Sequence, residues 1–276
     1  MHHDMTNAEP ADPLRVVLNA HARTLATATA RYSWRTPVEG PVQTSAYGHT
    51  DLTTGAATMT TVATTFPSLP PPAPLGGDGV LVLDGLIALP GQSTPEEVTA
   101  HALLVPEAGS LSMILLHGPP TQDDEGRWTS SRTDAPRLTM EVDPLLGSVA
   151  ATFHWLAAVV SAEPDGAPGR YRVDLDLSQL VDDAHPQRRE AVRLTLDQLR
   201  PGLSSGSASG TVSGIVEVDP ASGLVTSFSV TAEEPDEGPN EGSDEQSDEG
   251  PQIDPILLQL RDHGVTVQVE VAPARE

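Results

Sequence analysis

The chain has 276 residues, a formal net charge of −24 at pH 7 and an isoelectric point near 4.5, a balance that repels nucleic-acid phosphates and anionic membrane surfaces. Hydrophobic residues make up 38% of it and aromatic residues only 3%, which predicts a core of Val, Leu and Ala that suits aliphatic ligands. Cys and Lys are both absent, and this excludes thiol nucleophiles, disulfides, thiolate zinc sites, Schiff-base enzymes and the phosphate-binding P-loop.

The first predicted element is a helix that begins at Asp12-Pro13. Asp caps free backbone amides and Pro is tolerated at the first helical position, so this dipeptide is typical of a helix start. The apolar residues that follow share one side at helical spacing, and they are Leu14, Val17, Leu18 and Leu25. Residues 1–11 carry no such pattern and are expected to form a disordered tail.

Two short stretches have the same layout, an Asp, two further residues, a Ser or Thr, and a Gly. They are "DLTTG" at Asp51–Gly55 and "DPASG" at Asp219–Gly223. Both precede a strand-like run, so each predicts the corner of a β-hairpin. We interpret the repeat as scaffold and not as chemistry.

The segment between the first corner and the middle of the chain holds a loop and a further hairpin. Residues 67–79 are rich in Pro and Gly and predict a loop. In "VLVLDGLIAL", residues 80–89, Asp84-Gly85 separates two apolar runs and predicts a tight hairpin that is covered on both faces.

The middle of the chain predicts a strand and then a central helix. Residues 138–142 alternate in polarity, and Asp143-Pro144 then marks a helix that would continue to about residue 162. His154 lies on this helix, where we interpret it as a boundary residue and not as a base. The apolar stripe of the helix contains Leu145, Val149, Phe153, Leu156 and Val160.

The last third of the chain predicts three strands and two helices. Residues 171–177, 224–230 and 265–271 alternate apolar and polar side chains, as strands with one buried face do. Leu224, Phe228 and Val230 form the apolar set of the second strand. Helices are expected over residues 186–200 and, after Asp254-Pro255, over about 255–262.

Residues 233–250 form an acidic stretch with no apolar side chain to bury. Such a composition predicts a disordered insertion between two strands. Its uses would be solubility or docking on a basic protein partner. Residues 273–276 are expected to be a short tail after a single domain that spans 12–272.

The order of these elements resembles the bacterial lipoprotein carriers of the LolA, LppX and LprG type. The stretches that carry the resemblance are "LRVVLNAHARTLATATARYSW", "DGLIAL", "DPLLGSVAATFHWL", "GRYRVDLDLSQLV" and "GIVEVDPASGLVTSFSV". The resemblance implies an α+β fold in which a strongly curved antiparallel sheet, a half-barrel, wraps helices on its concave face. It also implies a lipid-holding cavity between the two.

We therefore expect a non-enzymatic protein that binds an acyl chain, a lipid or a similar apolar molecule. Candidate ligand-binding residues come from the apolar faces alone, and they are Leu146, Val149, Phe153, Leu156, Leu224 and Phe228. The alternative is an interaction protein with a packed interior, which would act through the acidic insertion or a sheet edge. Neither hypothesis requires a cofactor.

No combination of acid, base and nucleophile indicates an enzyme. The histidines lack the spacing of a helical zinc site, and Asp174 and Asp176 read as a solvated strand face. Met1-His2-His3 has the spacing of a terminal Cu(II) or Ni(II) site, but we interpret it as an exposed tail, so no metal is expected.

The sequence as written shows no secretion signal, no lipobox Cys and no apolar run of the roughly 20 residues that span a bilayer. Exported members of the carrier family have the signal and often the lipobox Cys. The expectation is therefore a cytoplasmic protein without a transmembrane segment. The alternative is an extracytoplasmic site if the true start lies upstream.

Overall fold

The computed structural model describes residues 12–35, 42–65, 96–129, 136–203, 211–231 and 256–270. Several predicted segments lie outside these residues: the tails 1–11 and 273–276, the loop 67–79, the hairpin 80–89 and the acidic insertion 233–250.

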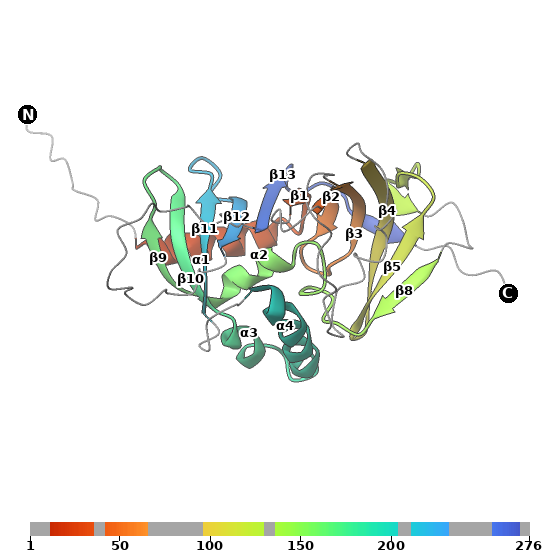
Figure 1. Ribbon diagram of the computed structural model, residues 1–276. Helices are drawn as coiled ribbons and strands as arrows, with labels where there is room; N and C mark the ends of the chain where they lie inside the picture. The colour runs from red at the N-terminus through yellow and green to blue at the C-terminus, as the bar shows by residue number, and fades with distance from the viewer. Residues whose placement is uncertain are drawn as a thin grey trace, which may run out of the picture.

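An eleven-stranded antiparallel sheet dominates the described chain (Figure 1). Its strand order is β8-β5-β4-β3-β2-β1-β13-β12-β11-β10-β9, so two meanders meet where β1 pairs with β13. We call the first meander the N-terminal half; its strands are β1 Thr29–Arg35, β2 Val42–Asp51, β3 Ala57–Thr65, β4 Glu96–Glu107, β5 Ser110–Leu116 and β8 Arg137–Met140. The C-terminal half contains β9 Val159–Pro164, β10 Arg170–Asp176, β11 Thr211–Val218, β12 Val225–Thr231 and β13 Ile256–Arg261.

Helical segments precede each meander or interrupt the second one. They are α1 Pro13–Ala26, α2 Ala151–Trp155, the 3₁₀ turn η2 Leu156–Ala158, α3 Ser178–Asp182 and α4 Arg189–Leu203. The sheet ends in the edge strands β8 and β9 and does not close into a barrel. The predicted α+β class, with a large antiparallel sheet and few helices, is therefore confirmed.

A second, three-stranded sheet contains β6 Thr121–Gln122, β7 Arg127–Thr129 and β14 Gln268–Glu270. The predicted strand at 265–271 is thus shorter than expected, and it pairs in parallel with β7 instead of joining the large sheet. This small sheet contacts the N-terminal half through β14 and β4, and the rings of Trp128 and His49 are 4.9 Å apart.

Helix α1 forms as predicted and packs on the C-terminal half. The Asp12 side chain accepts a hydrogen bond from the Leu14 amide at 3.2 Å, which caps the helix start. Val17 is fully buried, and α1 contacts β9, β11 and β12. At its last turn the Val225 amide donates a buried hydrogen bond of 2.8 Å to the Thr24 hydroxyl, which joins the helix to β12.

Both predicted hairpin corners are confirmed. Asp51 accepts hydrogen bonds from the amides of Thr53 and Thr54, and the Gly55 amide donates to the Asp51 carbonyl oxygen at 2.9 Å. The second corner, between β11 and β12, repeats this pattern around Asp219. The two corners turn one strand pair in each half of the sheet.

The predicted central helix is wrong over most of its length. Residues 144–150 form turns in which the amides of Leu145 and Leu146 donate to the Asp143 carboxylate. Only residues 151–158 are helical, and the chain then enters β9 at Val159, which pairs with β10. The β-branched pair Val159-Val160 favours this edge strand, and the apolar spacing alone did not distinguish the two structures.

The predicted helix at 255–262 is also wrong, because residues 256–261 form β13 in the middle of the sheet. Leu258 and Leu260 are 1% exposed and face the core. A short apolar run between turn residues is compatible with a buried strand or a helix, and here the pairing with β1 and β12 decides. The helix predicted at 186–200 is confirmed as α4, although it begins at Arg189.

The remaining strand predictions are confirmed with one change of face. β8 and β10 form as expected, and Val173 and Leu175 are buried. At the start of β12, however, Val225 is buried and Leu224 is only half-buried, the reverse of the prediction, whereas Phe228 and Val230 are buried as predicted. Because the register with β11 shifts between Glu217 and Val218, one extra residue of β12 exchanges the two faces.

Candidate functional site

Small side chains occupy one face of the N-terminal half. In the register of the sheet Met59 pairs with Ala102, Thr61 with Ala100, and Ala63 with Val98. On the neighbouring strand β2, the same face carries Thr44, Ala46 and Gly48, which pair with Ala63, Thr61 and Met59. Because residues at alternate positions share a face, these small residues leave a shallow trough across β2, β3 and β4.

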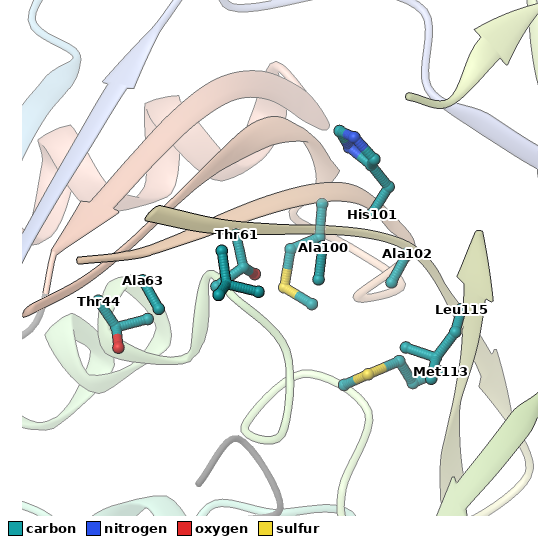
Figure 2. Close-up of a pocket in the computed structure, with 10 residues that line it drawn as sticks. Thr44, Thr61, Ala63, Ala100, His101, Ala102, Met113 and Leu115 are labelled. Atoms are coloured by element: carbon teal, nitrogen blue, oxygen red, sulfur yellow. The ribbon is translucent and has the colours of Figure 1, made fainter. Parts of the chain in front are cut away.

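The trough forms a hollow that extends to β5 (Figure 2). It contains about 470 Å³ of empty space when its open mouth is included, of which about 30 Å³ can hold the centre of a water-sized molecule. Met113 and Leu115 close it on the β5 side. The lining residues are Thr44, Met59, Thr61, Ala63, Val98, Ala100, His101, Ala102, Met113 and Leu115.

The walls of the hollow are almost entirely apolar, and its polar groups are hydroxyls. Thr61 is 7% exposed, and its side-chain oxygen has no hydrogen-bond partner. His101 in β4 is also a lining residue, but its ring lies on the face of β4 opposite the hollow. There its Nδ1 lies 3.0 Å from the Thr60 hydroxyl. Figure 2 accordingly shows the imidazole ring on the other side of the strand from Ala100 and Ala102.

The six ligand-binding residues predicted from the sequence lie elsewhere. Leu146 is buried before α2 and Val149 is half-buried. Phe153 and Leu156 are fully buried and Phe228 is 1% exposed, all within the hydrophobic core, while Leu224 is half-buried beside the second corner. None of the six lines the hollow.

The residues predicted from the sequence were mostly large and apolar, whereas the walls of the hollow are formed mainly by small residues, so the prediction did not include them. One signal was available in the sequence: Thr44, Ala46 and Gly48 recur at every second position, and so do Thr61 and Ala63 and then Ala100 and Ala102. A run of small residues at strand spacing indicates a depression in a sheet face.

A second group of residues lies between α1 and α2. The rings of His21 and Phe153 are 4.7 Å apart, and the Nε2 atoms of His21 and His154 have no hydrogen-bond partner. Burial lowers the pKa of His21 to about 4. Burial also lowers the pKa of His154 to about 4, and His21 contributes in the same direction. His154 is therefore a buried core residue, and its interpretation as a boundary residue is wrong.

An ion pair connects the turns before α2 to the residue that precedes α4. Asp143 is fully buried and accepts two hydrogen bonds of 2.8 Å from the guanidinium of Arg188. This carboxylate raises the pKa of Arg188. The Thr195 hydroxyl also accepts a hydrogen bond from the Asp143 amide. Every contact of Asp143 is thus structural.

Catalytic or metal-binding arrangements are not found among the described residues. No group of three His, Cys, Asp or Glu side chains there is placed to hold a metal ion. Asp174 accepts hydrogen bonds from Ser161 and Ser213, and Asp176 accepts from Ser178, which supports their interpretation as a strand face. Met1-His2-His3 lies outside the described chain. Within it, no helix has both the length and the apolar character to cross a membrane.

No protein-family model and no curated protein sequence matches the chain. Among solved structures it is similar to LprF from Mycobacterium bovis, with 9% identity, a TM-score of 0.41, and coverage of 94% of this chain and 95% of that one. LprF has the LppX/LprG/LolA-like lipoprotein fold that the sequence resembles. A porin-like protein from Bacteroides uniformis is also similar, with 10% identity, a TM-score of 0.28, and coverage of 84% and 96%. Neither similarity is close enough to transfer a function.

Proposed function

We propose that the protein is a non-enzymatic binder of a molecule with an aliphatic chain, and that the chain lies in the hollow on β2, β3, β4 and β5. One observation carries the proposal: the apolar face of the N-terminal half is built from small residues that leave room, whereas a packed core would fill it. Unfilled apolar surface loses packing contacts, so an aliphatic ligand that fills it gains them.

The size of the hollow suits a thin ligand. Three strand spacings separate β2 from β5, about 14 Å at the usual distance between strands. The enclosed part is narrower than the cavities that hold compact ligands, so a bound chain must displace side chains or remain partly exposed. Met59 and Met113 are suited to this movement, because Met is flexible and fits irregular apolar surfaces.

We infer further that the sheet curves as a half-barrel around the helices. Two observations support this: α1 contacts β9, β11 and β12, and one hydrophobic cluster continues from Leu104 in β4 to Val173 in β10. In this arrangement the hollow opens on the concave side beside the helical layer.

The expected affinity follows from the length of the buried chain. Each buried methylene contributes about 0.8 kcal/mol, so ten of them contribute about 8 kcal/mol before ordering costs. This sum corresponds to a dissociation constant no tighter than about micromolar.

The test is a fluorescence titration of the delipidated protein with a decyl chain that carries a pyrene label. Ala100→Leu places three more carbon atoms in the hollow and replaces about three ligand methylenes, so the affinity should fall roughly 50-fold. Thr99→Leu is the matched control, because Thr99 is exposed on the other face of the same strand. It should bind like the unchanged protein.

The proposal fails if the folded, delipidated protein shows no saturable binding of the labelled chain. It also fails if Ala100→Leu and Thr99→Leu bind equally well. Native mass spectrometry of protein from its own host, which detects a co-purified lipid, is an independent check.

The alternative function is an interaction protein, and the packed C-terminal half supports it. Phe228 and Leu175 in its strands and Phe153 in α2 are at most 1% exposed, so these large side chains pack in the core. Its edge strand β9 exposes Val160, which a partner strand could cover. A stable complex with a basic protein, formed by the Ala100→Leu variant as well as by the unchanged protein, would favour this function.

A further inference from the structure

The Thr61 hydroxyl stands out within the hollow. It is 7% exposed, it lacks a hydrogen-bond partner, and it lies among alanines and methionines. A buried hydroxyl without a partner is destabilising, and Val has the same shape without this penalty. The presence of Thr at this position is therefore explained if a bound molecule supplies the missing partner.

The surroundings of Thr61 determine what kind of partner this can be. Among the residues that the structure describes, no Arg, Asp or Glu lines the hollow, and the ring of His101 lies on the other side of β4. A carboxylate or phosphate placed beside Thr61 would lose its hydration and find no cation among the lining residues. The net charge of −24 adds a general repulsion of anions.

We propose that Thr61 is a specificity-determining residue that hydrogen-bonds an uncharged oxygen of the ligand, such as an alcohol or ester oxygen. This inference rests on the proposed function, since it assigns the polar group of the same ligand. A hydroxyl both donates and accepts, so it serves an alcohol as well as an ester carbonyl. The aliphatic part then extends toward Ala102, Met113 and Leu115.

The experiment compares Thr61→Val, Thr61→Ser and the control Thr99→Val in the delipidated full chain. Each variant is titrated with the pyrene-labelled decyl chain, which has no oxygen, and the label is then displaced with decanol or decanoate. Thr61→Val should weaken decanol binding, relative to binding of the labelled chain, by roughly fivefold, the usual net effect of one hydrogen bond. Thr61→Ser should restore decanol binding, and Thr99→Val should change neither ligand.

The charge requirement gives a second readout. Decanoate should bind the unchanged protein at least roughly tenfold more weakly than decanol, because its carboxylate has no cation to pair with. Without ligand, Thr61→Val should melt at the same temperature as the unchanged protein or higher, since it removes an unpaired buried hydroxyl.

Failure of this inference is distinguishable from failure of the proposed function. If the labelled chain binds but Thr61→Val does not weaken decanol, or if decanoate binds as well as decanol, the role of Thr61 is overturned while the hollow remains a binding site. If the labelled chain does not bind, the proposed function fails and the inference with it.

Discussion

The two halves of the large sheet have the same strand pairing and opposite packing. Both are antiparallel meanders with an Asp-x-x-Ser/Thr-Gly corner. In the C-terminal half the inward residues are large, and helix α1 contacts three of its strands. In the N-terminal half the corresponding face carries Ala, Gly and Thr and contains the hollow. The large inward residues are Val173, Leu175, Val216, Phe228, Leu258 and Leu260, all at most 1% exposed.

This difference shows that the backbone arrangement does not decide where a ligand can bind. Strand pairing is set by the backbone and the corners, and side-chain volume on one face decides whether the sheet is filled or hollow. Stability should therefore reside mainly in the C-terminal half, and binding in the N-terminal half.

The largest expected effect is that of acid on the C-terminal half. The pKa values of His21 and His154 are about 4 in the folded protein and about 6.5 when unfolded, so the unfolded state binds more protons between these values. Stability should be complete above about pH 6.5 and should fall as the pH drops toward 4. The loss is roughly 3 kcal/mol for each imidazole. Urea unfolding at pH 7.0, 5.5 and 4.5 measures it.

A control separates this effect from the protonation of carboxylates. The double variant His21→Leu, His154→Leu replaces both imidazoles with aliphatic side chains of similar size, so neither position can take up a proton. It should lose clearly less stability over the same pH range. An equal loss in both proteins would show that these histidines do not control the acid response.

The next largest effect is expected from Phe153→Ala. Phe153 is fully buried and its ring lies 4.7 Å from that of His21 in α1, so its removal should cost about 3–5 kcal/mol of unfolding free energy. Binding of the labelled decyl chain should not change. Val149→Ala, at a half-buried position of the same segment, should cost only about 1 kcal/mol. A small stability loss with altered binding would instead place the ligand at the residues predicted from the sequence.

The smallest expected effect is the difference in stability between variants of the two repeated corners, whose neighbours differ. Gly55 and Gly223 both have positive φ, +83° and +69°, so Ala at either site costs about 1–2 kcal/mol. A Cβ at Gly55 would lie 2.3 Å from the Pro144 carbonyl oxygen, which is backbone. At Gly223 it would meet the mobile end of the Arg23 side chain.

Gly55→Ala should therefore lower the free energy of unfolding more than Gly223→Ala, by the roughly 1–3 kcal/mol that overpacking adds, and should have the lower thermal midpoint. Differential scanning calorimetry of the two variants measures this. Equal thermal midpoints would mean that both corners accommodate an alanine side chain equally well.

Sequence reasoning predicted those parts of the fold that local chemistry determines. Asp12-Pro13 starts α1, the two corners form, and the alternation of residues 171–177 gives β10. It failed where tertiary pairing decides. Residues 256–261 have no local preference that excludes a helix, and only their place between β1 and β12 makes them a strand.

The candidate site was less predictable than the fold. Large apolar residues such as Phe153 and Phe228 were expected to hold a ligand, and in the structure they fill the core. Small residues such as Ala63 and Ala100 recur at strand spacing, but within one strand this pattern does not show which strands together form a hollow. Their importance depends on the register that brings β3 and β4 together, and a single strand does not reveal this register.

The pairing of β1 with β13 has a consequence for folding during synthesis of the protein. These neighbours are more than 200 residues apart in the sequence, so β13 can take its place between β1 and β12 only after the long segment that separates it from β1 has been translated. Until then β1 and β12 each have a strand edge without its final partner, in the middle of the future sheet. A nascent chain of this protein must therefore protect two open edges from other chains until β13 is translated.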